Sequence, residues 1–246
     1  MTVAAPRIEY CALLGMTQAA ALVGGEGWVY WLSLPRRGAP AAGPRGARET
    51  GRWQLAPHDE VRGTRRRYRG DSLVLETDVE TVAGGVRLVD FVPLGVDPAA
   101  VVRLVEGIRG RVRILMDLRF DGGPIRAWPP DGGRAQRAIG EGDGSWLRAP
   151  VATRDAGDAV HADFFVSAGE LLPFVLSRGA AGEHAPVVDP LRALADTESF
   201  LGRASPSTTF LESLTTAELA TAAMQPLVSP PTLAPDCAAP TARCCG

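Results

Sequence analysis

Apolar residues recur at nearly every second position from residue 28 to residue 178, and clusters of Gly, Pro or Asp separate the runs. The clearest run is Arg111–Phe120, where apolar and charged side chains alternate and Leu115 alone breaks the pattern. Because successive side chains of a strand point to opposite faces of a sheet, this run predicts a strand with one buried and one solvated face. The same pattern over the whole stretch is typical of an all-β fold.

Two neighbouring runs predict a hairpin. Leu73–Val79 and Val86–Asp90 both alternate, and residues 83–85 between them can supply the positive φ of a tight turn. Two stretches, Arg37–Arg48 and Pro129–Gly144, are rich in Gly, Pro and Arg and are predicted to be long surface loops. Shorter strands are predicted at Trp28–Leu34, Gly51–Ala56, Val101–Ile108, Ser145–Arg148, Ala162–Val166 and Phe174–Arg178.

The pattern changes at Asp189-Pro190. Asp is a favoured N-cap, Pro suits the first helical turn, and apolar residues then follow at helical spacing. Residues 189–204 are therefore predicted to form a short helix after a β-domain of residues 1–188. Residues 205–246 are rich in Ser, Thr, Ala and Pro, so we expect a disordered tail there.

The composition excludes several classes of partner. Hydrophobic residues make up 46% and charged residues 22% of the 246-residue chain, which is ordinary for a folded protein. A formal net charge of −2 gives no global attraction to nucleic acid or to an anionic membrane, so neither partner is expected. No secretory signal or long apolar stretch is present, and the expected location is the cytoplasm.

The cysteines do not indicate a metal site. Cys11 stands alone and Cys237, Cys244 and Cys245 lie within the last ten residues, a spacing that matches no zinc pattern and no disulfide framework. The three histidines are scattered and are expected on the surface or in loops. We therefore expect no metal and no other cofactor.

Several segments follow one another in a recognisable order over roughly residues 8 to 200. They are Tyr10–Gly15, Trp31–Arg36, Tyr68–Thr77, Val86–Pro93, Val102–Val112, Leu118–Asp121 and Phe174–Leu176. In this order they resemble the N-terminal domain of glycoside hydrolase family 15, in its bacterial trehalase-like and glucoamylase-like branch. The resemblance implies a supersandwich-like antiparallel β-sandwich, a linker helix and then a large helical catalytic domain, an (α/α)6 toroid.

The resemblance also implies the chemistry. Family members hydrolyse an α-glucosidic bond with inversion, which needs a general acid and a general base about 6.5–9.5 Å apart. Both carboxyl groups belong to the helical domain, which we expect to be absent from this chain. The leading interpretation is therefore a non-catalytic N-terminal domain whose ancestral partner is that toroid.

Two alternatives stay open. One is a glucoamylase- or trehalase-type α-glucosidase acting on trehalose or α-glucans, whose catalytic part is supplied in trans. The other is a stand-alone carbohydrate-binding module. At three places the chain departs from the family pattern. Tyr30 replaces an Asp, residues 37–40 replace Phe-Asp-Ser-Pro in the loop that approaches the sugar pocket, and Gly15-Met16 replaces a Gly-Asp pair. These departures weaken the expectation that the domain itself binds glucose.

Three residues are the candidate substrate contacts. They are Trp31, Arg36 and Trp128. The resemblance places Trp31 beside the inter-domain loop, which follows Arg36, and Trp128 precedes Pro129-Pro130 in a predicted loop. Aromatic faces of this kind can stack on sugar rings, although tryptophan is more often a core residue.

Two carboxylate pairs, Glu76 with Asp78 and Asp117 with Asp121, are candidates for acid–base chemistry. Glu76 and Asp78 are two apart, and residues two apart on a strand lie about 7 Å apart on one face, which an inverting pair tolerates. Solvated strand faces commonly carry such pairs, so we expect no catalytic residue in this chain. The basic run Arg62–Arg69 has no aromatic other than Tyr68 and is predicted to be a charged edge strand.

Overall fold

A computed structural model describes residues 10–15, 19–34, 51–70, 72–94, 96, 99–120, 125–128, 135–139, 143–157, 159–180 and 187–203. These residues form fourteen strands, all paired antiparallel, and one helix. In chain order they are β1 (Ala12–Gly15), β2 (Ala20–Val23), β3 (Trp28–Ser33), β4 (Gly51–Pro57), β5 (Val61–Tyr68), β6 (Leu75–Thr81), β7 (Gly84–Phe91), β8 (Ala100–Phe120), β9 (Ile125–Trp128), β10 (Ala135–Ile139), β11 (Asp143–Arg148), β12 (Arg154–Ala156), β13 (Ala159–Ser167), β14 (Leu171–Ala180) and α1 (Pro190–Arg203). The predicted all-β sandwich followed by a short helix is confirmed.

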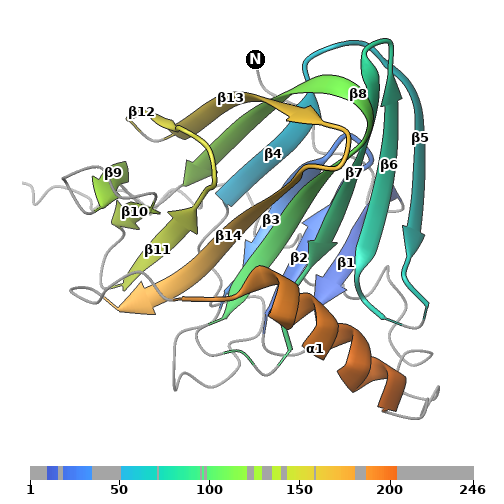
Figure 1. Cartoon of the computed structure of the whole chain (residues 1–246). Coiled ribbons are helices and arrows are strands. Elements are labelled where there is room, and N and C mark those ends of the chain that lie inside the picture. Colours follow the sequence, from blue (N-terminus) through green and yellow to red (C-terminus); the bar gives the residue numbers. More distant parts are fainter. Residues whose placement is uncertain are drawn as a thin grey trace, which may run out of the picture.

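The long strand β8 belongs to two sheets (Figure 1). Its second half pairs with β4 and β13, which gives a first sheet in the order β1-β2-β3-β4-β8-β13-β12. Its first half pairs with β7 and β14, which gives a second sheet in the order β5-β6-β7-β8-β14-β11-β10-β9. The two sheets form the layers of the sandwich, and β8 joins them.

Two glycines let β8 pass from one sheet to the other. Gly110 has a φ of 70°, a conformation that L side chains rarely adopt. A Cβ at Gly110 would lie 2.2 Å from the carbonyl oxygen of Ala83, and one at Gly107 would lie 2.0 Å from that of Ser167. The register with β7 also shifts at this corner, between Gly85 and Val86. Such irregularities are the usual way in which a strand turns a sandwich corner.

The main core lies between the two sheets. Both sheets contribute inward-facing side chains, because apolar residues alternate along the strands with residues that face outward. Its large members include Trp53, Leu55, Ile114 and Met116 from the first sheet and Leu75, Leu88 and Phe174 from the second.

A buried ion pair crosses this core. Arg103 on β8 and Asp90 on β7 have side-chain exposures of 0% and 1%, and Arg103 Nε lies 2.9 Å from Asp90 Oδ1. The same guanidinium donates to the carbonyl oxygen of Trp53 at 3.0 Å and to that of Gly27 at 2.9 Å, both in the first sheet or its turn. It also lies 5.3 Å from the centre of the Trp53 ring. Arg103 therefore ties a strand of the second sheet to two points of the first.

Most predicted strands are confirmed, and β5 is an edge strand that pairs only with β6 within the described residues. The prediction of a loop at Pro129–Gly144 is wrong where β10 lies, because β9 and β11 pair with that segment on both sides. Val101–Ile108 and Arg111–Phe120 are one continuous strand, since the glycines bend the chain without ending it. The predicted loop at Arg37–Arg48 and the predicted tail lie outside the described residues.

Replacement of Arg103 by Met is expected to lower the free energy of unfolding by about 3–5 kcal/mol, because Asp90 becomes a buried charge without its partner. Urea denaturation followed by tryptophan fluorescence measures the change. Arg109→Met is the matched control: Arg109 pairs with Glu80 at 2.8 Å, but its side chain is 66% exposed. Exposed pairs contribute about 0–1 kcal/mol. Equal losses of unfolding free energy in the two variants would contradict the conclusion that the buried Arg103–Asp90 pair stabilises the sandwich more than an exposed pair does.

Candidate functional site

The helix α1 begins at the predicted cap. Oδ1 of Asp189 accepts hydrogen bonds from the backbone N–H groups of Leu191 and Arg192 at 3.1 and 3.2 Å. Pro190 occupies the first helical position, where its missing N–H costs nothing. Asp189 therefore sets the point at which the chain leaves the sandwich and turns across the second sheet (Figure 1).

The underside of α1 packs on the outer face of the second sheet. Val188 and Ala193 are buried there against Val89, Phe91 and Val102. Thr197 is also buried: its hydroxyl donates to the carbonyl oxygen of Ala193 at 2.7 Å and accepts from the N–H of Leu94 at 3.3 Å. This contact explains why Val89, Phe91, Val102 and Leu104 are apolar although they face away from the main core, since α1 and the chain before it cover them.

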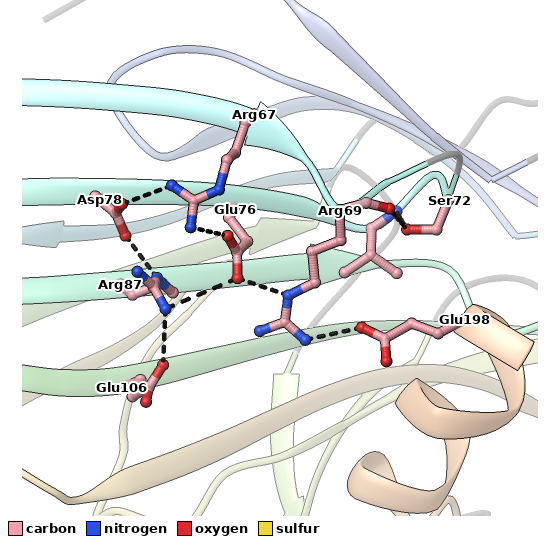
Figure 2. Close-up of polar contacts among 9 residues, drawn as sticks. Arg67, Arg69, Ser72, Glu76, Asp78, Arg87, Glu106 and Glu198 are labelled. Carbon is pink, nitrogen blue, oxygen red and sulfur yellow. Dashed lines mark hydrogen bonds and ion pairs between the residues drawn. The ribbon is translucent and has the colours of Figure 1, made fainter.

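Beside the helix the same face carries a charged network, defined here as Arg67, Arg69, Glu76, Asp78, Arg87, Glu106 and Glu198 (Figure 2). Its centre is Glu76 on β6, whose side chain is 5% exposed and contacts Arg67 and Arg69. Arg69 Nε lies 2.6 Å from Glu76, and Arg69 Nη1 lies 2.8 Å from Glu198 on α1. Arg69 thus connects the sheet to the helix.

The other half of the network surrounds Asp78. Arg87 Nε lies 2.6 Å from Asp78 Oδ1, and Arg67 Nη1 lies 3.1 Å from Oδ2. Register produces these contacts, because Asp78 is directly opposite Arg87 and Glu76 is directly opposite Arg67. Partial burial opposes ionisation of Asp78, but the hydrogen bonds from Arg87 and Arg67 outweigh it and lower the pKa of this carboxyl.

This geometry does not suit an acid–base pair. An inverting hydrolase needs one carboxyl whose raised pKa keeps it protonated as the general acid. The pKa of Asp78 is lowered instead, and Glu76 is enclosed by arginines. Of the second candidate pair, Asp117 accepts from Arg119 Nε at 3.1 Å, and Asp121 lies outside the described residues.

A shallow hollow of about 460 Å³ lies on the first sheet, between β8, β13 and the chain before β12. Asp163 is the one carboxyl group in its lining. Arg113 holds it with two hydrogen bonds, Nε to Oδ1 at 2.8 Å and Nη2 to Oδ2 at 2.6 Å. These hydrogen bonds lower the pKa of Asp163, so this carboxyl is not suited to be the general acid of glycoside cleavage.

Two of the predicted sugar contacts, Trp31 and Trp128, lie on separate strands that are not neighbours. Trp31 lies in β3 opposite Leu22, and Trp128 lies in β9 opposite Ala135. These strands belong to different sheets, with five strands between them in the sheet order. Arg36 lies outside the described residues. A role of any of the three in sugar binding stays a prediction.

Two features were missed by sequence reasoning. One is the buried Arg103–Asp90 pair. The sequence hint to it is that each of these two charged residues interrupts a short run of apolar residues. The other is the contact of Arg69 with α1. In the sequence Arg69 is one of several arginines in a basic run, and nothing distinguishes it from the others. Nothing in the sequence pairs Arg69 with Glu198, because 129 positions separate them.

The described residues thus form an all-β domain followed by a helix that packs on its second sheet. Residues 1–127 match the family described as trehalase-like, N-terminal. The match covers more than half of the chain, and the chain belongs to this family.

Comparison with solved structures gives a fold-level likeness to "Putative kojibiose phosphorylase from human microbiome" at 9% identity and a TM-score of 0.41. The likeness covers 87% of this chain and 34% of that one, so the chain spans about a third of that protein's length. No curated protein matches the chain.

Among the described residues, no helix is long and apolar enough to cross a membrane. No three of their His, Cys, Asp and Glu side chains gather closely enough to hold a metal ion.

Asp78 is expected to make the stability of the domain depend on pH. A lowered pKa in the folded state stabilises the fold above the ordinary value of 3.8, and this contribution is lost as the pH falls below it. The difference in urea midpoint between the wild type and Asp78→Asn should therefore shrink on acidification. Asp196→Asn, at a side chain 66% exposed, is the control and should show a smaller change. A difference in urea midpoint that grows on acidification would contradict the expected direction of the pH dependence.

Two alanines of α1 test its packing. Ala193→Glu places a charge against the apolar face of the second sheet and is expected to lower the free energy of unfolding by about 2 kcal/mol or more. Ala195→Glu, two residues along and exposed, should have little effect. Hydrogen exchange should show that α1 loses protection in the first variant only. Equal protection in both variants would mean that α1 does not depend on this contact.

Proposed function

We propose that this domain is a non-catalytic N-terminal domain of a family 15 glycoside hydrolase, and that it packs against a helical catalytic domain through α1. The family match supports the first part at the level of a trehalase-like N-terminal domain. The substrate class that this family suggests is an α-glucoside such as trehalose, maltose or a short α-glucan.

The observation that carries the proposal is that the candidate carboxyl groups are paired with arginines. In the charged network and in the hollow, each acid with a suitable position is already held by an arginine. Hydrogen bonds from arginine favour the ionised form of an acid, whereas a general acid must keep its proton near neutral pH. The described part of the chain is therefore suited to support a catalytic domain and not to replace one.

The free side of α1 supports the docking part of the proposal. Val187 is 82% exposed and Leu191 is 53% exposed, although the opposite side of the helix is buried on the sheet. Val187 lies three residues before the first residue of α1 and Leu191 is its second residue, so both are exposed at the point where the chain enters the helix. Exposed apolar residues at such a point suit a contact with a second domain.

Glucose release tests the catalytic part. The purified chain is expected to release no glucose from trehalose, maltose or maltooligosaccharides above a buffer blank. Addition of a separately produced helical catalytic domain from a trehalase-like relative serves as the positive arm. Turnover by this chain alone, removed by substitution of one of its carboxyl groups, would contradict the proposal and favour a complete α-glucosidase.

Sedimentation tests the docking part with the same two proteins. We expect a complex that Val187→Ser/Leu191→Ser weakens about tenfold or more, which corresponds to the loss of roughly 1.4 kcal/mol. Val82→Ser is the matched control, since Val82 is 62% exposed but lies in the β6–β7 hairpin. Equal weakening by both changes, or no complex at all, would remove α1 as the docking element.

A further inference from the structure

A single row of side chains crosses the outer face of the first sheet. The strand register places Trp28 opposite Gln54, Gln54 opposite Asp117, Asp117 opposite His161, and His161 opposite Arg154. The row therefore runs straight over β3, β4, β8, β13 and β12, which lie side by side in this sheet. Four inter-strand spacings make it about 19 Å long.

The whole row faces away from the core. Trp53 and Leu55, the neighbours of Gln54, are buried between the sheets, and so are Met116 and Leu118 on either side of Asp117. Side chains alternate along a strand, so Gln54 and Asp117 point outward. No member of the row is classed among the buried residues.

Aromatic side chains lie at the β3 end of the row and beside its other end, where Phe165 is four residues along β13 from His161. At the β3 end the rings of Trp28 and Tyr30 lie 6.3 Å apart, centre to centre, and tilted by 33°. Burial and the nearby Glu26 raise the pKa of Tyr30 to about 12, so its hydroxyl remains a donor at neutral pH. At the β13 end Phe165 is 48% exposed, and the guanidinium of Arg111 lies 4.2 Å from the ring centre.

The β13 end is also hollowed. His161 and Arg154, the last two members of the row, line the hollow described above together with Asp163 and Phe165. The row and the hollow thus form one continuous surface, with a partly exposed aromatic ring on each side.

The polar groups along this surface match a ligand rich in hydroxyl groups. The Gln54 amide and the His161 imidazole each offer a donor and an acceptor, Asp117 accepts, and Arg154 donates. Asp117 and Asp163 each have an arginine partner, so the surface lacks the uniform positive charge that a polyanion needs. Aromatic rings beside a few convergent polar groups are typical of sites for neutral organic ligands.

We propose that this face, from Trp28 to the hollow at Arg154, binds a neutral oligosaccharide. The sugar rings stack on Trp28 at one end and contact the exposed part of Phe165 beside the hollow, and the hydroxyl groups between them bond to the polar row. The length of the row selects a chain of sugars over a single one. This site lies on the opposite layer from α1, so binding there is independent of the docking proposed above.

Calorimetric titration of the full chain with maltoheptaose tests the proposal, with cellohexaose, glucose and inorganic phosphate as comparison ligands. We expect saturable binding of at least one of the two oligosaccharides and much weaker binding of glucose. Trp28→Ala and Phe165→Ala should each weaken binding about tenfold, the scale of one lost aromatic contact. Tyr68→Ala is the matched control, because Tyr68 is 40% exposed but lies on β5 of the other sheet.

Two further variants separate the site from general effects on folding. Trp28→Phe keeps an aromatic ring, so it should retain most of the affinity while it removes the ligand-induced change in tryptophan fluorescence. Arg154→Ala should weaken binding several-fold, whereas Arg62→Ala, on the exposed edge strand β5, should not. Binding of phosphate alone, absence of oligosaccharide binding, or full affinity in Trp28→Ala/Phe165→Ala would each overturn the proposal. None of these outcomes bears on docking through α1.

Discussion

The guanidinium of Arg103 sits where the two layers of the sandwich meet, and the positions of β3, β4, β7 and β8 all depend on it. Moving an ion pair out of water is costly, and such a pair persists only when all its hydrogen-bonding groups find partners. Here Asp90 and two backbone carbonyls from the first sheet supply them. Because hydrogen bonds require defined distances and angles, this contact specifies how the layers align in a way that apolar packing alone does not.

The two outer faces of the sandwich then take different roles. On the second sheet, α1 covers the apolar part and Arg69 joins its edge to the charged network. On the first sheet, the polar row and the hollow stay open. One layer is therefore committed to holding the neighbouring part of the chain, and the other is available to a ligand. The buried pair at the centre keeps the two faces in a constant relation.

Sequence reasoning reached the fold class, most strands and the start of α1, because alternation and the Asp189-Pro190 cap are local signals. It did not reach β10 or the continuity of β8, which depend on neighbouring strands and on glycine contacts across the corner. The candidate sites were harder still. Trp28 and Arg154 share one row only because four successive strand pairings align them. No local sequence pattern predicts the register of these pairings.

The shared strand β8 has a consequence for how the domain can be divided. The family match ends at residue 127, soon after β8, whereas β13 and β14, which complete both halves of that strand, begin at Ala159 and Leu171. A polypeptide cut at that boundary would leave two open hydrogen-bonding edges in the middle of the sandwich. Open edges of this kind invite association between molecules. The cooperative unit therefore extends well past the segment by which the family is recognised.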